Sequence, residues 1–302
     1  PDRDAGSRAT WQVIETLVAR GYQVTFWPEN LHYDPDYAPA LQQLGVEVLF
    51  GGEYSGRFDA WMAEHGGWLD AVVLNRPHVA APLVDSVRRH SRAVLVYYGH
   101  DIHHLRMQQQ LALKPDSSVG CELERLRDFE HALWRQADVV LYPSVEETAH
   151  VRAWLTRNAP SATTRAETIP LYAYSRLADV QIPAPDVRRD ILFVAGFAHA
   201  PNVDAAVWFV RTVLPLVTSE LPGVRVSLVG SNPHPDVLAL ASDQVEVSGY
   251  VSDEELARRY RHARVSIAPL RFGGGVKGKV LESLLHGVPC VTTSVGLQGL
   301  AD

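Results

Sequence analysis

The sequence predicts an α/β protein with two parallel-sheet domains. Short apolar runs that resemble buried strands alternate with segments of helical periodicity, and this alternation is typical of parallel sheets whose strands are joined by helices. The length of 302 residues fits two domains of ordinary size. A stretch with prolines at 170, 183 and 185 and few apolar runs interrupts the alternation and predicts a linker. We therefore expect an N-terminal domain at 1–172, a linker at 173–189 and a C-terminal domain at 190–302.

Composition excludes several classes of protein. Hydrophobic residues make up 46% and charged residues 21%, so both domains can bury a core and disorder is not expected. The formal net charge of −7 argues against non-specific binding of nucleic acid, which needs a basic surface. The two cysteines, Cys121 and Cys290, form no CxxC pattern or disulfide framework. No apolar run approaches the ~20 residues that span a bilayer. We expect a cytoplasmic protein, either free or at the inner face of the membrane, and the sequence looks shortened at both ends.

The first domain is expected to begin with a loop over Pro1–Arg8, followed by a helix that ends at Gly21. The predicted strands are Val24–Trp27, Val46–Phe50, Ala71–Leu74, Ala93–Tyr98 and Val139–Tyr142. The predicted helices are Tyr37–Leu44, Val79–His90, Cys121–Gln136 and Ser144–Leu155. Ser144 and Glu147 have the spacing of a capping box, in which each side chain caps the backbone of the other.

Polar residues directly follow the predicted strand Ala93–Tyr98, in the run Gly-His-Asp-Ile-His-His-Leu-Arg that ends at Arg106. An open parallel sheet places its ligand crevice at such strand ends. His100 and His103 are three residues apart and could chelate a metal with Asp101, but no distant Cys or Glu completes a site. We therefore expect no metal here. Arg106 is either an acceptor or phosphate contact or a surface charge.

The second domain is expected to contain strands at Ile191–Ala195, Val224–Val229, Val245–Val247 and Val265–Ala268. After the first of them, Gly196–Asp204 predicts a turn that leads into a helix, with a proline near the helix start. The interior of that helix is expected to be packing. Cys290 falls in a further apolar strand and is expected to act as a small hydrophobic residue.

A glycine-rich stretch follows the last of these four strands, with the sequence Arg271-Phe-Gly-Gly-Gly-Val-Lys-Gly-Lys279. Glycines let the backbone turn tightly and approach a ligand closely. A helix is expected to begin at about Val276 and to end before Gly287. Its unpaired N–H groups and its dipole would attract an anion, and Lys277 and Lys279 add positive charge. The pattern predicts a cradle for phosphate groups.

The expected helix after the cradle has two faces. Four apolar residues should pack on the sheet: Val280, Leu281, Leu284 and Leu285. Lys279, Glu282 and His286 share the other face, so a cation and a carboxylate could bind the phosphate and the sugar hydroxyls of one nucleotide. A P-loop is disfavoured because Val280 stands where a hydroxyl must bind Mg²⁺. An ordinary βα turn with solvated lysines is the remaining alternative.

The second domain resembles the retaining glycosyltransferases of family 4 in three runs. They are Ile267-Ala-Pro-Leu-Arg-Phe-Gly-Gly-Gly-Val-Lys-Gly-Lys-Val-Leu-Glu282, Gly287-Val-Pro-Cys-Val-Thr-Thr293 and Gly296-Leu-Gln-Gly-Leu300. The resemblance is weaker at 95–106 and 191–204 but covers most of the chain. It implies the GT-B architecture, in which two Rossmann-like, doubly wound domains face a cleft.

The resemblance also implies roles for individual residues. The catalytic residues would be His100, which contacts the donor sugar, together with Lys279 and Glu282. The donor-binding residues would be Gly274, Gly275, Val276, Lys277, Tyr250, Val251 and Asn202. The acceptor or phosphate side would be formed by Gly6, Arg8, Asp101 and Arg106. Many members carry another Glu eight positions before the helix Glu; here Gly274 stands at that position, as in a subgroup with a similar turn.

The function implied is transfer of a sugar from a nucleotide-sugar donor to a hydroxyl of a glycan or lipid-linked glycan, as in polysaccharide biosynthesis. The nucleotide sugar is a substrate, so no cofactor and no metal are expected. Nucleic acid is not an expected partner, and peripheral membrane association is compatible with a lipid-linked acceptor. Two alternatives remain: a nucleotide-sugar-binding module without turnover, and another GT-B enzyme such as a nucleotide-sugar epimerase.

Overall fold

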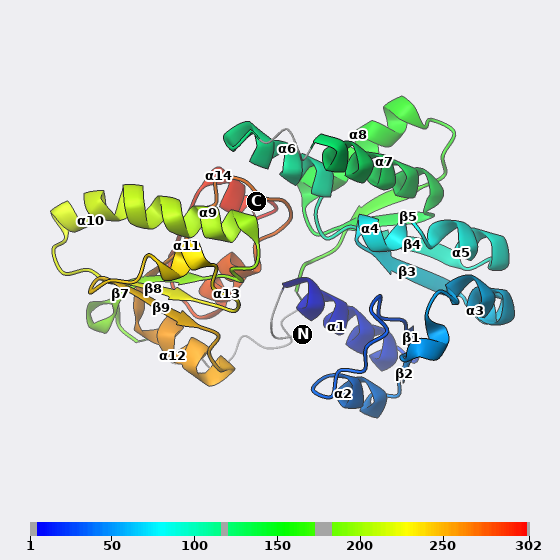
Figure 1. The fold of residues 1–302 in the computed structure, drawn as a ribbon, viewed down its shortest axis with the longest axis horizontal. Helices are drawn as coiled ribbons and strands as arrows, with labels where there is room; N and C mark the ends of the chain where they lie inside the picture. The colour runs from blue at the N-terminus through cyan, green and yellow to red at the C-terminus, as the bar shows by residue number, and fades with distance from the viewer. Residues whose placement is uncertain (1–4, 116–119, 173–182, 301–302) are drawn as a thin grey trace. The chain divides into compact units, whose positions relative to one another are not determined.

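The computed structural model describes residues 5–115, 120–172 and 183–300. The chain divides into two compact units (Figure 1). The first consists of Pro1–Gln108 and Pro115–Tyr172, and the second of Gln109–Lys114 and Ala173–Asp302. Residues 173–182 of the predicted linker lie outside the described residues. Each unit contains a parallel sheet, and the predicted α/β class with parallel sheets is confirmed.

The first unit is built around four parallel strands in the order β3-β4-β5-β6. They are β3 (Ala71–Asn75), β4 (Val94–Tyr98), β5 (Val139–Tyr142) and β6 (Arg165–Thr168). A separate two-stranded sheet pairs β1 (Thr25–Phe26) with β2 (Glu47–Val48). The α-helices in this part of the chain are α1 (Ala5–Ala19), α2 (Ala38–Gln43), α3 (Phe58–His65), α4 (Pro77–Ala80), α5 (Val84–His90), α6 (His103–Leu113), α7 (Gly120–Gln136) and α8 (Val145–Asn158).

Burial in the core of the first unit explains which of its strands could be predicted from the sequence. Leu95 and Tyr97 on β4, and Val140 and Tyr142 on β5, are fully buried at every second position. Trp134 of α7 is buried against them. β6 was not predicted, because Ala166 is its only buried residue and its neighbours are exposed, as suits the last strand of a sheet.

The beginning of the described chain corrects one prediction. α1 begins at Ala5, so residues 5–8 are helical and do not belong to a loop. Residues 1–4 of the predicted loop lie outside the described residues. The apolar residues further along this helix dominate its structure: Ile14 is buried and packs with Leu41 and Val46.

The second unit contains five parallel strands in the order β11-β10-β7-β8-β9. Their bounds are β7 (Arg189–Val194), β8 (Val226–Val229), β9 (Val245–Gly249), β10 (Ala263–Ala268) and β11 (Cys290–Thr292). The chain runs outward from β7 to β8 and β9 and then returns to the other side of β7. This reversal makes the boundary between β7 and β10 the topological switch point, where an open α/β sheet binds its ligand at the carboxyl ends of the strands.

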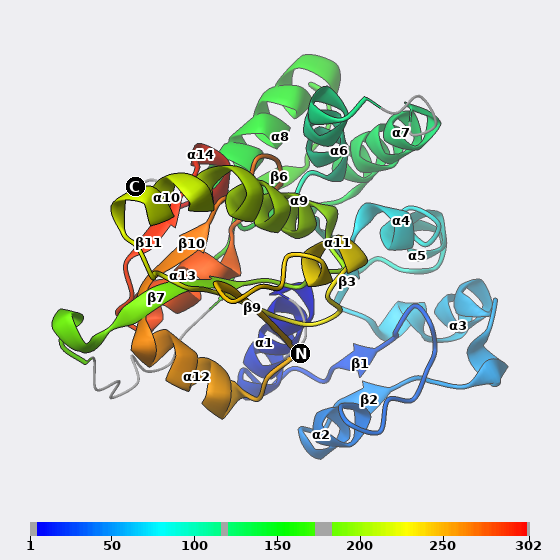
Figure 2. The same cartoon turned by 60° about the vertical axis from the view of Figure 1, so that its left-hand side comes forward.

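Helices cover both faces of this sheet (Figure 2). Ile191 and Phe193 pack on the side of α9 and α10, whereas Leu192 packs with Tyr260 of α12 on the other side. The alternation along β7 is that of a strand buried on both faces. The helical segments are α9 (Ala200–Trp208), a π-helical turn (Phe209–Val213), α10 (Leu214–Glu220), α11 (Pro235–Leu238), α12 (Asp253–His262), α13 (Gly278–Leu285) and α14 (Ser294–Leu297).

Candidate functional site

The glycine-rich turn lies at the switch point of the second unit, between the end of β10 and the start of α13. Gly275 has a φ of 66° and Gly273 a φ of 153°, values that residues with a Cβ rarely adopt. α13 begins at Gly278, two residues after the predicted start, and Lys277 is its N-cap residue. The predicted sequence of strand, glycine-rich turn and helix N-terminus is therefore present, with a longer turn.

Lys277 supports the turn from within. Its side chain is buried, at 8% exposure, and Nζ donates to the carbonyl oxygen of Gly274 at 2.9 Å and to that of Gly275. These hydrogen bonds satisfy an ammonium group that has lost contact with water. We infer that Lys277 holds the shape of the turn, a different role from the direct donor contact expected from the sequence.

Lys279 lies in the first turn of α13 and is half-buried. Its Nζ donates to Oδ1 of Asn202 at 2.6 Å and lies 4.9 Å from the centroid of the Phe193 ring. Burial, followed by the nearby charge of Lys277, lowers the pKa of Lys279 to about 7, although the carboxylate of Glu282 acts in the opposite direction. An anionic ligand would favour the protonated form of such a lysine and would accept hydrogen bonds from it.

Asn202 connects the two strand ends at the switch point. It lies in the first turn of α9, after β7, and its Nδ2 donates to the carbonyl oxygen of Gly196 at 2.8 Å. Its Oδ1 accepts from Lys279, so one side chain joins the loop after β7 to the helix after β10. The structure thus brings together two predicted site residues that are 77 positions apart in the sequence.

A second connection between α9 and the turn involves residues to which the sequence assigned no role. Arg271 Nε and Nη2 donate to the two carboxylate oxygens of Asp204, at 2.8 and 2.5 Å. Asp204 is buried, and the guanidinium also lies 5.8 Å from the centroid of the Trp208 ring. Bidentate pairs of this kind fix geometry well. The first positive residue of the turn is therefore already matched by a carboxylate, whereas Lys279 faces a neutral amide.

The remaining face of α13 agrees only in part with the prediction. Glu282 is half-buried one turn after Lys279. His286 lies just beyond the helix and stacks on the Tyr260 ring at 4.6 Å, so it is held by packing. Leu284, which was expected to pack on the sheet, is 60% exposed. Ser283 is fully buried instead, because its hydroxyl donates to Val288 O at 2.8 Å and lies 2.5 Å from that of Ser266.

Tyr250 and Val251 follow β9, the edge strand that β8 separates from β7. Tyr250 is 55% exposed. Val251 packs with Leu192 and Val229 in the core on one face of the sheet. An exposed aromatic ring at a strand end can cover a flat apolar group such as a base.

His100 lies at the corresponding end of the sheet in the first unit, directly after β4. Its φ of 62° is unusual for a residue with a side chain. Nε2 lies 3.1 Å from Oδ1 of Asn75, at the end of β3, and the ring lies 4.1 Å from that of Tyr98. Leu31, Arg76, Asp190 and Asn232 also have a positive φ, so the backbone angle does not single out His100, and its contact with the donor sugar stays a prediction.

Asp101 and Arg106 form part of a buried polar network. The carboxylate of Asp101 lies 3.0 Å from Arg106 Nη1 and 3.2 Å from His103 Nε2, and it is only 12% exposed. The pairing explains why Arg106 is held in place. It also makes Asp101 a structural partner within the unit as well as a predicted acceptor contact.

The start of α6 is capped by two buried carboxylates from other helices. Glu147 accepts from Ile102 N at 3.1 Å, and Glu130 accepts from the N–H groups of His103 and His104 at 2.9 and 3.0 Å. The predicted capping box is therefore incomplete: Ser144 accepts from Glu147 N at 3.2 Å, but the Glu147 side chain caps α6 instead. A helix N-terminus that is already paired with carboxylates does not attract a phosphate.

Replacing Glu130 with glutamine is expected to destabilise the protein by about 1.5–3 kcal/mol, because charge-assisted hydrogen bonds to α6 are lost. Glu130 is fully buried and also lies 2.6 Å from His104 Nδ1. Chemical denaturation followed by tryptophan fluorescence measures the change. Glu124→Gln on the same helix, where the carboxylate pairs with exposed Arg127, is the matched control and should change stability little. Equal effects of the two substitutions would contradict this role for Glu130.

Gly6 and Arg8, predicted in a loop on the acceptor or phosphate side, both lie within α1. The carbonyl of Gly6 accepts from the Thr10 hydroxyl at 2.9 Å, and the guanidinium of Arg8 lies 5.6 Å from the centroid of the Tyr172 ring. Gly, Ser and Asp are typical of turns, but the helix formed by the residues that follow extends through this segment.

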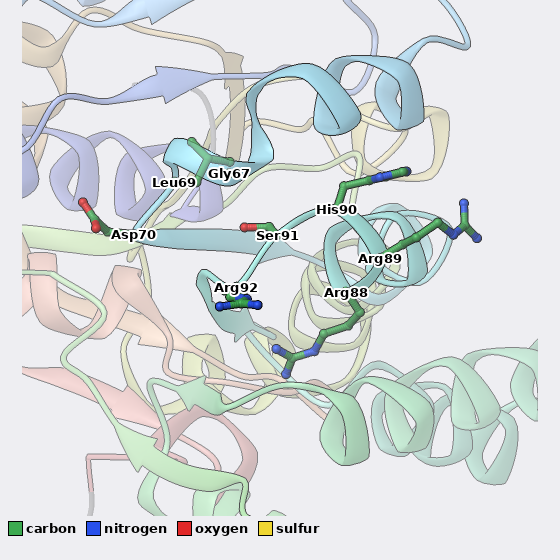
Figure 3. Close-up of a pocket in the computed structure, with 8 residues that line it drawn as sticks. All are labelled: Gly67, Leu69, Asp70, Arg88, Arg89, His90, Ser91 and Arg92. Carbon is green, nitrogen blue, oxygen red and sulfur yellow. The ribbon is translucent and has the colours of Figure 1, made fainter.

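A separate cavity of about 740 Å³ opens at the other end of β4, beside the end of α5 (Figure 3). Arg88, Arg89 and Arg92 line it, but their side chains point in different directions. Arg88 pairs with Asp138 at 3.0 Å, and Arg89 pairs with Asp59 at 2.9 Å. Basic residues at a helix C-terminus also stabilise its dipole. The cavity therefore does not form a focused anion site.

Within 5–115, 120–172 and 183–300, no helix is both long and apolar enough to cross a membrane. Among the same residues, no three His, Cys, Asp or Glu side chains are grouped so that they could hold a metal ion.

Comparisons with known proteins bear on both units. Residues 188–302 match the family model described as "Glycosyl transferases group 1". A stretch of 117 residues is 28% identical to the "Uncharacterized 44.6 kDa protein in cps region" of Klebsiella pneumoniae and covers 36% of this chain and 30% of that protein.

Solved structures also resemble this chain. A structure of OtsA without ligand aligns with this chain at a TM-score of 0.62 and 10% identity. The alignment covers 98% of this chain and 83% of the OtsA chain. The pneumococcal O-GlcNAc transferase GtfA, in complex with UDP and GlcNAc, matches 78% of this chain with a TM-score of 0.56 and 13% identity. The present chain covers 44% of the length of GtfA. The fold is therefore that of the GT-B glycosyltransferases, and the region 188–302 carries the sequence features of glycosyl transferases group 1.

Proposed function

We propose that the protein is a retaining glycosyltransferase that moves a sugar from a nucleotide-sugar donor to a hydroxyl of a glycan or lipid-linked glycan. The observation that carries the proposal is the placement of Lys279, the glycine-rich turn and the N-terminus of α13 together at the switch point of the second sheet. This is the region that matches the family model. The relative in the cps region favours an acceptor in polysaccharide biosynthesis.

In this proposal the donor diphosphate binds at the turn. Negative charge grows on the leaving nucleoside diphosphate as the sugar becomes oxocarbenium-like, and the helix N-terminus and Lys279 stabilise that charge without reorganisation. These groups supply the positive charge that a metal ion supplies in other phosphate sites. Glu282 binds the ribose hydroxyls, and Tyr250 covers the base. His100 contacts the donor sugar. A trehalose-6-phosphate synthase with a TM-score of 0.56 to this chain is described as transferring with retention, which supports the stereochemical part of the proposal.

A panel of UDP-, GDP-, ADP- and dTDP-sugars, incubated with the protein and a mixture of glycan acceptors, tests the proposal. Release of one nucleoside diphosphate that requires an acceptor, with an α-linked product from an α-linked donor, is the expected result. Binding of a nucleotide sugar without any release would favour the second candidate, a binding module without turnover. The specific observation behind that candidate is Gly274, which stands where many family members carry a glutamate.

Glu282→Gln is expected to weaken binding of a ribonucleoside diphosphate by about 1.5–3 kcal/mol, because the amide accepts more weakly than the carboxylate. The matching 2′,3′-dideoxynucleotide should lose no further affinity in the variant. Titration calorimetry with both proteins and both ligands gives the complete cycle. Additive losses would show that Glu282 does not contact the ribose.

His100→Ala is expected to lower the rate of transfer by roughly 10²-fold while leaving the affinity for nucleoside diphosphate nearly unchanged, the pattern of a lost transition-state interaction. Turnover and thermal midpoint are measured on the same preparation. Asn75→Ala serves as the matched control, since it removes the hydrogen-bond partner of His100 and leaves the imidazole in place. A lower midpoint with unchanged turnover per folded molecule would make His100 structural.

A further inference from the structure

We propose that Asn202 is a positioning residue of the donor site, which holds the Lys279 ammonium at the switch point with an uncharged acceptor so that its positive charge remains available to a diphosphate. The inference rests on the proposed function. It adds how the positive charge of Lys279 is left without a negative partner on α9, so that a bound diphosphate can pair with it. Asn202 is expected to act on the donor through Lys279, to which it is hydrogen-bonded.

The hydrogen-bond pattern fixes the orientation of the Asn202 amide. An ammonium group can only donate, so the atom 2.6 Å from Lys279 Nζ must be the oxygen. A carbonyl oxygen can only accept, so the atom 2.8 Å from Gly196 O must be the nitrogen. Each contact enforces the same amide orientation. The backbone after β7 thereby determines where the side chain of Lys279 lies.

The neighbouring ion pair between Arg271 and Asp204 shows how a charged partner on α9 affects a cation. Two residues further along α9, Asp204 holds Arg271 in a bidentate ion pair with a buried carboxylate. That pair fixes the turn but neutralises the cation. An asparagine at position 202 positions Lys279 through one hydrogen bond and adds no negative charge from α9. The contrast between an amide and a carboxylate, two residues apart, is the basis of the proposal.

The charged groups around Lys279 act on its pKa in opposite directions. The ammonium of Lys277 disfavours a charge on Lys279, whereas the carboxylate of Glu282 favours it. Desolvation is the larger effect and holds the pKa of Lys279 at about 7. A carboxylate at position 202 would shift this balance strongly toward a permanent charge and would compete with the ligand for it.

The test uses Asn202→Asp and Asn202→Ala, with Gln244→Glu as the matched control. Gln244 is exposed just before β9, at the opposite end of the sheet, so its substitution adds the same charge away from the site. The chain has three lysines, Lys114, Lys277 and Lys279. Proteins labelled with ¹³C at lysine Cε therefore give an NMR titration of Lys279 that needs no nucleotide.

We expect Asn202→Asp to raise the pKa of Lys279 by at least one unit and to weaken binding of the preferred nucleoside diphosphate at least tenfold at pH 7. Asn202→Ala should weaken binding several-fold while the lysine still titrates near neutral pH, and Gln244→Glu should resemble the unmodified protein. An unchanged Lys279 titration in Asn202→Asp would overturn the inference. If the titration shifts as expected but the unmodified protein binds no nucleoside diphosphate, the contact is confirmed and the proposed function fails.

Discussion

Replacing Lys279 with alanine is expected to weaken binding of a nucleoside diphosphate by about 1.5–3 kcal/mol, or roughly 10- to 150-fold in Kd. The size follows from the loss of a charge-assisted hydrogen bond in a half-buried site, where water does not replace the ammonium fully. Of the three cations in the turn and at the start of α13, Lys277 faces backbone carbonyls and Arg271 faces a carboxylate. Lys279 is therefore the residue whose loss should be felt most.

Two further variants separate binding from folding. Lys279→Met keeps the length of the side chain and removes a partly desolvated charge, so its thermal midpoint should not fall although its affinity does. Arg211→Ala removes one positive charge from an exposed helical position of the same unit and should leave the Kd unchanged. An unchanged Kd in Lys279→Ala, measured by titration calorimetry, would remove Lys279 from the donor site.

Affinity for the nucleoside diphosphate is expected to fall as the pH rises from 7 to 9, by up to tenfold per pH unit. In the free protein the pKa of Lys279 is about 7. A bound diphosphate raises that pKa, so the complex holds more protons than the free protein between about pH 7 and the higher value, and binding weakens as pH rises through this window. Below about pH 7 both states are protonated, and this dependence ends.

Other groups titrate outside that window. The second ionisation of a phosphate group, near pH 6, is complete above pH 7. Burial lowers the pKa of His286 and raises that of Cys290 from its usual value of 9, so neither changes charge appreciably between pH 7 and 9. Calorimetry in buffers of different ionisation enthalpy should show proton uptake on binding at pH 8. Lys279→Arg keeps its charge at every pH used, and the same pH dependence in that variant would assign the effect to another group.

The sequence revealed the parts of the site that depend on local pattern. Glycines before a helix predict a tight turn, and the structure has it, with positive φ at Gly273 and Gly275. The binding of an anion there stays a prediction. The start of α13 was placed two residues early, because Val276 and Lys277 are compatible with a helix but the turn extends through them. The exposure of Leu284 was missed because hydrophobic periodicity does not reveal that Ser283 is buried by hydrogen bonds.

Contacts between distant segments were beyond the reach of local reasoning. Asp204 and Arg271 are 67 positions apart, and only the return of β10 to the side of β7 brings them together. The same holds for Glu130, whose carboxylate caps α6 from another helix. Glu147 had the spacing of a capping box and was therefore given a local partner, whereas tertiary structure directs its side chain to Ile102.

Titration of the unmodified protein with UDP, GDP, ADP and dTDP, each beside its monophosphate, tests most directly whether the glycine-rich turn is a diphosphate site. We predict that at least one diphosphate binds at least tenfold more tightly than its monophosphate, because the β-phosphate is the group that the helix N-terminus and Lys279 receive. The difference should largely disappear in Lys279→Met. Equal affinity for diphosphate and monophosphate, or no binding of any of the four, would contradict the account.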